Sequence, residues 1–158
     1  MVNPLIVVHA FLGELGLVCF VWVFVEMLNP TPSRLKRAKI ASFFGVVFFF
    51  VSWIVGGYYY STDYGSLVKP VIKAGPQPWA HSIITEVKEH VFLFLPFLAI
   101  LNYTLIIRFS SHLKGDKDAR VRKAILYLSV LILFIGALMG AMGYLISSGY
   151  RSALEALS

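Results

Sequence analysis

The chain has 158 residues, of which 58% are hydrophobic, with a mean hydropathy of +0.78 and a formal net charge of +6. Such a composition is far more apolar than that of a soluble domain of the same length, which excludes the soluble globular class. The positive charge does not indicate nucleic-acid binding, because the basic residues stand in blocks between apolar runs, where membrane proteins carry their orientation signals. We therefore expect the lipid bilayer, and no nucleic acid, as the partner.

Four apolar segments follow one another along the chain, each with about 20 apolar residues, enough to cross a bilayer. The expected helices cover about 4–28, 40–60, 83–108 and 124–147. No basic region precedes the first segment, so we expect it to be retained in the mature protein. The sequence thus predicts an all-α fold, an integral membrane four-helix bundle, as a single transmembrane domain over residues 1–158. The outer loop, 61–80, is rich in proline and aromatic residues and is expected to form an ordered cap at headgroup level.

The basic residues predict the orientation of the bundle. The first and third loops hold ten of them and the rest of the chain four. The ten are Arg34, Lys36, Arg37, Lys39, Arg108, Lys114, Lys117, Arg120, Arg122 and Lys123; the four are Lys69, Lys73, Lys88 and Arg151. Cytoplasmic loops of membrane proteins carry the excess of Lys and Arg. We therefore expect a plasma or inner membrane protein with the first and third loops in the cytoplasm and both termini outside.

Two histidines are expected at the same depth, near the outer ends of the first and third helices. On the first helix, a stripe at helical spacing leaves a groove that a flat macrocycle or a tightly packed helix could fill; it consists of His9, Gly13, Gly16 and Phe20. On the third helix, Glu86 stands one turn before His90 and could orient its ring as a metal ligand. Pro96 is expected to kink the third helix just below His90.

Imidazoles on facing helices are how a bundle holds haem iron. We therefore expect one b-type haem in the outer half of the membrane, with His9 and His90 as its axial ligands, in a membrane electron-transfer protein. Glu14 lies deeper on the first helix and would pass protons from a bound quinone. The arrangement resembles in pattern the small four-helix membrane cytochromes b, although those often hold a second haem, which His81 and His112 are not placed to bind.

Two other functions stay open. One is a haem-free site for iron, zinc or copper; its ligands would be His9 and His90 with Glu86, Glu89, Met139 or Met142. The other is a non-catalytic membrane subunit that docks into a larger complex or a homo-oligomer through glycine-lined helix faces. The remaining polar residues are expected to have structural roles only. His81 and His112 are expected at the surface, and Glu26 is expected to be solvated near the first loop. Lys88 is expected to reach the headgroups or to pair with Glu86 or Glu89, and Cys19 to be a buried hydrophobic residue.

Overall fold

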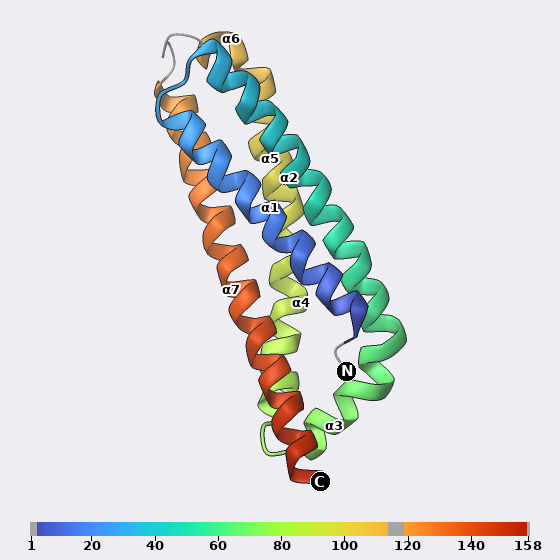
Figure 1. The fold of residues 1–158 in the computed structure, drawn as a ribbon. Coiled ribbons are helices and arrows are strands. Elements are labelled where there is room, and N and C mark those ends of the chain that lie inside the picture. The colour runs from blue at the N-terminus through green and yellow to red at the C-terminus, as the bar shows by residue number, and fades with distance from the viewer. Residues whose placement is uncertain (1–2, 114–118, 158) are drawn as a thin grey trace.

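The computed structural model describes residues 3–113 and 119–157, and this part of the chain is helical without any strand. Four long helical segments are long and apolar enough, by length and composition, to cross a membrane. They lie side by side along one common direction (Figure 1). The elements are α1 (Pro4–Leu28), α2 (Pro32–Tyr59), η1 (Tyr60–Val68), α3 (Lys69–Ala74), η2 (Ala80–Thr85), α4 (Glu86–Phe92), α5 (Phe94–Arg108), α6 (Ser110–Leu113) and α7 (Ala119–Leu157).

The first two helices begin where capping residues stand in the sequence. The Asn3 side chain accepts a hydrogen bond from the backbone N–H of Leu5 at 2.9 Å, and Pro4 occupies the first turn of α1, where no N–H is needed. The Thr31 side chain caps α2 in the same way. The span of α1 is the one expected, whereas α2 begins at its cap, eight residues before the apolar run that predicted it.

Other boundaries differ from the expected ones because polar residues end an apolar run without ending a helix. The segment expected as a loop is helical over most of its length, as η1 and α3, and α7 extends beyond the expected fourth helix at both ends. The helix of the third span is interrupted by a turn at Leu93. Pro96, one turn later, has no N–H to donate to the Phe92 carbonyl, and this missing hydrogen bond accounts for the interruption.

The chain forms a core between all four long segments, with α1 packed on α2 and α7, and α5 packed on α2 and α7. We call the end formed by η1, α3 and η2 the cap end, and the end formed by α6 and the start of α2 the basic end (Figure 1). The end of α7 lies at the cap end (Figure 1). Lys114 and Lys117, which contributed to the expected orientation, lie outside the described residues.

The closest packing joins α1 and α2, which run in opposite directions. Phe49 of α2 lies over Gly16, and Phe20 of α1 lies over Gly45, so each aromatic ring occupies the space that the opposite glycine leaves. The two rings are stacked, with centroids 5.6 Å apart and planes 3° from parallel. The groove beside Gly16 is therefore filled by a packed helix, which was one of the two outcomes expected.

At the basic end, Glu26 is buried and paired, where the sequence had predicted a solvated carboxylate. Its oxygens accept hydrogen bonds from Arg34 Nε at 3.1 Å, Arg37 Nε at 2.6 Å and Trp22 Nε1 at 2.9 Å. The short connection between α1 and α2 explains the difference, because it holds the first turn of α2 against the last turn of α1.

The α1–α2 contact makes a testable prediction. A methyl group at Gly16 or Gly45 would lie 2.5 or 2.6 Å from a carbon of the opposite phenylalanine ring. We expect Gly16→Ala and Gly45→Ala each to lower the free energy of unfolding by about 1–3 kcal/mol, through overpacking. Thermal unfolding of the detergent-solubilised protein measures the loss. Gly57→Ala is the control, because nothing lies within 4 Å of the added methyl group there; equal stability of all three variants would contradict the packing described.

Candidate functional site

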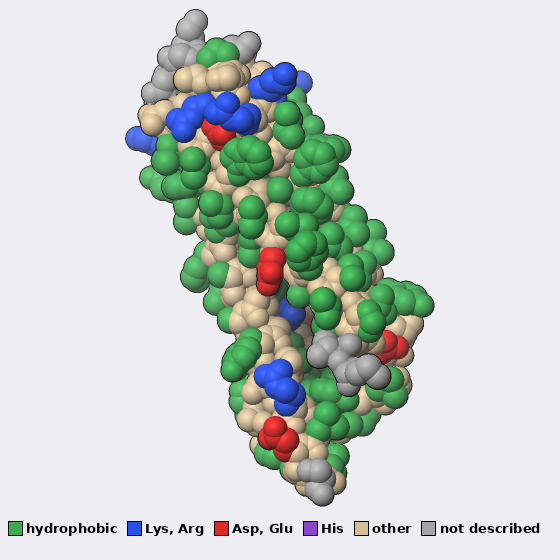
Figure 2. All heavy atoms as spheres, viewed as in Figure 1, with side chains coloured by type: hydrophobic (Ala, Val, Ile, Leu, Met, Phe, Trp, Pro, Cys, Tyr) green, Lys and Arg blue, Asp and Glu red, His purple; other side chains and the backbone are tan. Residues whose placement is uncertain are grey.

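A cavity of about 1260 Å³ lies between α1, α2, α4 and α7 in the half of the molecule nearer the cap end. Figure 2 shows a hollow between α1 and α7, with acidic and basic side chains in and beside it. Along α1 the cavity reaches from Asn3 to Leu17, a distance of about 21 Å at the rise of an α-helix. Its wall is mostly apolar, and polar groups gather toward the cap end.

His9 lies on the cavity wall with its ring held by α2. Its Nδ1 is 2.8 Å from the Ser52 backbone carbonyl oxygen and 3.0 Å from Ser52 Oγ, and that hydroxyl in turn donates to the His9 carbonyl at 2.8 Å. Gly56 makes room for the ring, because a Cβ there would lie 2.6 Å from Nδ1. A carbonyl oxygen only accepts hydrogen bonds, so Nδ1 carries the proton and Nε2 keeps its lone pair.

The structure does not bring His90 to the same centre as His9. His90 is exposed, and its Nδ1 is 2.6 Å from the backbone carbonyl oxygen of Glu86. The ring that contacts His9 is Phe92, with ring centroids 6.1 Å apart. Because Phe92 is two residues after His90, the two side chains leave the helix about 200° apart. The Glu86 carboxylate is also exposed, so the expected orienting contact is made by its main chain instead.

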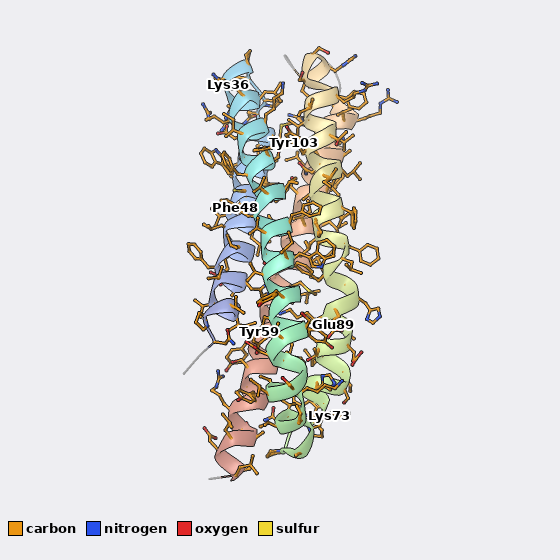
Figure 3. The ribbon with its side chains drawn as sticks, turned by 90° about the vertical axis from the view of Figure 1, so that its right-hand side faces the viewer. Lys36, Phe48, Tyr59, Lys73, Glu89 and Tyr103 are labelled. Atoms are coloured by element: carbon orange, nitrogen blue, oxygen red, sulfur yellow. The ribbon has the colours of Figure 1, made fainter. Side chains whose placement is uncertain are left out.

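Two residues of α4, Lys88 and Glu89, bring opposite charges to the cavity. The Lys88 ammonium reaches α7, where its Nζ is 3.2 Å from the position of a Cβ at Gly143, and it makes no hydrogen bond or ion pair with any described residue. The Glu89 carboxylate interacts with Tyr60, but its buried Oε1 has no hydrogen-bond partner within the described chain. Glu89 lies level with Tyr59 of α2 across the molecule (Figure 3). The expected pairing of Lys88 with Glu86 or Glu89 is therefore not formed.

At the cap end, a hydrogen-bonded chain closes the cavity. Tyr64 Oη lies 2.8 Å from Thr85 Oγ1 and 3.1 Å from His81 Nδ1, and Thr85 Oγ1 donates to the Ala80 carbonyl at 3.0 Å. His81 is only 2% exposed, which corrects its expected place at the surface. The helical turn of η2 accounts for this, because it directs His81 inward against Tyr64 of η1.

The other residues predicted from sequence are divided between the cavity and the protein core. Gly13, Glu14 and Met139 line the cavity, and Glu14 is exposed at its edge. Gly16 lies under Phe49, and Met142 packs against the core, so neither lines the cavity. Among residues 3–113 and 119–157, no three His, Cys, Asp or Glu side chains are grouped in a way that could hold a metal ion. The ligand set expected for a haem-free metal is not assembled there.

The contribution of α2 to this site was missed, although the sequence holds a signal for it. The stripe on α1 has a counterpart on α2 with the same helical spacing, formed by Gly45, Phe49, Ser52 and Gly56. Two matching stripes indicate two helices packed face to face. That pairing would have placed Ser52 and Gly56 beside His9.

Comparisons with protein-family models, with curated proteins and with solved structures gave no match to this chain. The chemistry of the cavity is therefore the basis for a functional assignment.

Proposed function

We propose that this protein is an integral membrane four-helix bundle that binds a lipid-soluble amphiphile in the cavity at its cap end. The observation that carries the proposal is the cavity itself, which joins a long apolar wall to a small group of charged side chains. An amphiphile has the same two parts, a tail and a polar head. The biochemical role is to hold such a molecule within the membrane.

The orientation proposed for the bundle follows from its basic residues. Arg34, Arg37 and Arg122 are at the basic end, close to the connection between α1 and α2. An excess of Lys and Arg is typical of the cytoplasmic side. This orientation puts the cap end, both termini and the cavity in the outer half of the membrane.

The dimensions of the cavity suit a molecule that lies along one leaflet. Its length of about 21 Å compares with about 15 Å for half of a bilayer's hydrocarbon core, and the remainder reaches the headgroup region. Its volume of about 1260 Å³ exceeds the range of about 300–1,000 Å³ that is usual for pockets of small, drug-sized ligands. A tailed lipid or a quinone with an isoprenoid chain would fill more of it than a small metabolite.

Access to the cavity favours a ligand that arrives from the lipid. The hollow between α1 and α7 opens on the side of the molecule (Figure 2), and this side would face the bilayer in the proposed membrane protein. Gly140 of α7 lines the cavity and is exposed, and nothing lies within 4 Å of the position of a Cβ there. A lipid-soluble molecule could therefore enter from its own leaflet without leaving the membrane.

Filling the cavity at Gly140 tests this proposal. We expect Gly140→Leu to lower the amount of bound amphiphile at least about tenfold, because the added side chain occupies the tail region and its contacts are lost. Native mass spectrometry of the purified protein measures the bound molecule as a mass increment. Ala137→Leu, on the same helix and exposed outside the cavity, is the matched control. Equal occupancy in both variants, or no bound amphiphile in the unsubstituted protein, would contradict the proposal.

A second candidate is a b-type haem held by His9 alone, in a membrane electron-transfer protein that exchanges electrons with a quinone. The observation that favours it is the hydrogen bond from His9 Nδ1 to the Ser52 carbonyl. Histidines that bind metals commonly donate their other ring N–H to a carbonyl or carboxylate, which fixes the tautomer and the ring orientation. His9 has this arrangement, with Nε2 left for the iron.

Haem titration separates this candidate from the first. If the second candidate is right, added haemin should give a Soret band that His9→Ala abolishes, because no other imidazole described on the cavity wall replaces His9. His90→Ala should leave the band unchanged, since its ring is exposed and bonded to its own helix. Loss of the band in both variants would restore the two-histidine site, and no band in any sample would remove haem from consideration.

A further inference from the structure

The two charges inside the cavity are on neighbouring residues, and neither forms an ion pair with a described residue. Lys88 makes no hydrogen bond or ion pair with any described residue, and Glu89 Oε1 is buried without a hydrogen-bond partner there. Burying an ion in an apolar environment costs several kcal/mol unless an opposite charge or hydrogen bonds compensate it. A bound molecule that supplies both missing partners would remove both costs.

The other charged groups of the cavity lie at its edge and have other means of compensation. Asp63 accepts a hydrogen bond from the Asn3 side chain, and Arg151 donates to Ser147 Oγ at 2.8 Å. Glu14 and Arg151 are exposed. The side chains that still lack a partner are therefore Lys88, which needs an anion, and Glu89, which needs a cation that donates a hydrogen bond.

We propose that the head group bound in this cavity is a zwitterion with a phosphate and a primary ammonium, as in phosphatidylethanolamine. The inference rests on the proposed binding of an amphiphile and names its chemical class. Lys88 binds the phosphate and Glu89 binds the ammonium. A primary ammonium has three N–H donors for the buried Oε1, whereas a quaternary ammonium has none.

Other head groups satisfy only part of this requirement. A neutral quinone leaves both side chains without an opposite charge. An anionic lipid pairs with Lys88 but has no cation for Glu89, and a cationic amphiphile pairs with Glu89 but has no anion for Lys88. Only a head group with an anion and an N–H-bearing cation pairs both residues at once.

The apolar part of the cavity accommodates the tails of the same molecule. Leu17, Phe49 and Met139 line its deep end, where Leu17 meets Gly136, about two turns of α7 from Gly143, which Lys88 reaches. These two turns of α7, about 10 Å, let the head lie at Lys88 and Glu89 while the tails follow the α1–α7 opening toward the middle of the membrane.

The test compares head groups on identical tails. The full-length protein, delipidated in detergent, is titrated with dioleoyl phosphatidylethanolamine, phosphatidylcholine and phosphatidylglycerol, and native mass spectrometry measures the bound fraction. We expect phosphatidylethanolamine to bind at least about tenfold more tightly than either of the others, because each of those leaves one charge-assisted interaction unmade. Phosphoethanolamine without tails, at the same concentration, should not displace it.

Variants assign the two parts of the head group. Lys88→Met should weaken binding of phosphatidylethanolamine about tenfold, and Lys88→Arg should restore most of it. Glu89→Gln should reduce the preference for phosphatidylethanolamine over phosphatidylcholine to near unity. Lys73→Met is the control, because Lys73 is exposed and lies outside the cavity.

The outcomes distinguish the inference from the function on which it rests. If none of the three lipids binds, the proposed function fails and the inference fails with it. If all three bind with equal affinity, or phosphatidylglycerol binds best, the protein still holds an amphiphile but the zwitterion assignment is wrong. Displacement by phosphoethanolamine alone would overturn the assignment to a lipid.

Discussion

The contact between α1 and α2 is the constraint on which the rest of the structure depends. Two phenylalanine rings fit over two glycines, and this fit allows only one register between the helices, since a shift by one turn would place a ring against a side chain. The same register sets His9 against Ser52 and Gly56. Because α1 follows α2 toward the cap end, it diverges from α7 beyond the level where Leu17 meets Gly136 (Figure 1). The cavity lies in this space between α1 and α7.

The two ends of the molecule differ in how their charged side chains are compensated, and the contrast points to the cavity. At the basic end, Glu26 accepts hydrogen bonds from two arginines and an indole, so its desolvation is compensated inside the protein. At the cap end, Lys88 and Glu89 are adjacent yet do not pair. Among the described residues, the Lys88 ammonium has no partner and the Glu89 carboxylate has one on only one of its oxygens, so this end lacks the compensation that Glu26 receives. Functional sites are where such groups are expected.

The helices could be predicted from the lengths of the apolar runs, but their inward faces could not all be predicted. The stripe of His9, Gly13, Gly16 and Phe20 on α1 does face α2. On the third helix, Glu86 and His90, which were expected to face the first helix, are both exposed. In a soluble protein, polarity marks the outer face of a helix. In a helix that is apolar all round, small residues mark the packed face better, and the third helix has none beside His90. The helical cap was missed for a related reason. Polar residues end an apolar run but do not end a helix, so helix boundaries placed at the ends of apolar runs were too short.

Glu89 is the residue that decides between the two ligands considered for the cavity. A haem on His9 and a lipid along α1 would occupy the same space, so they exclude each other. Lys88 does not discriminate, because both a haem propionate and a lipid phosphate carry the negative charge that it requires. Glu89 would discriminate, because its carboxylate would repel a propionate and attract a primary ammonium. The single buried, unpartnered oxygen on α4 therefore favours a zwitterionic lipid over haem, even though the geometry of His9 would suit either an iron ligand or a structural contact between α1 and α2.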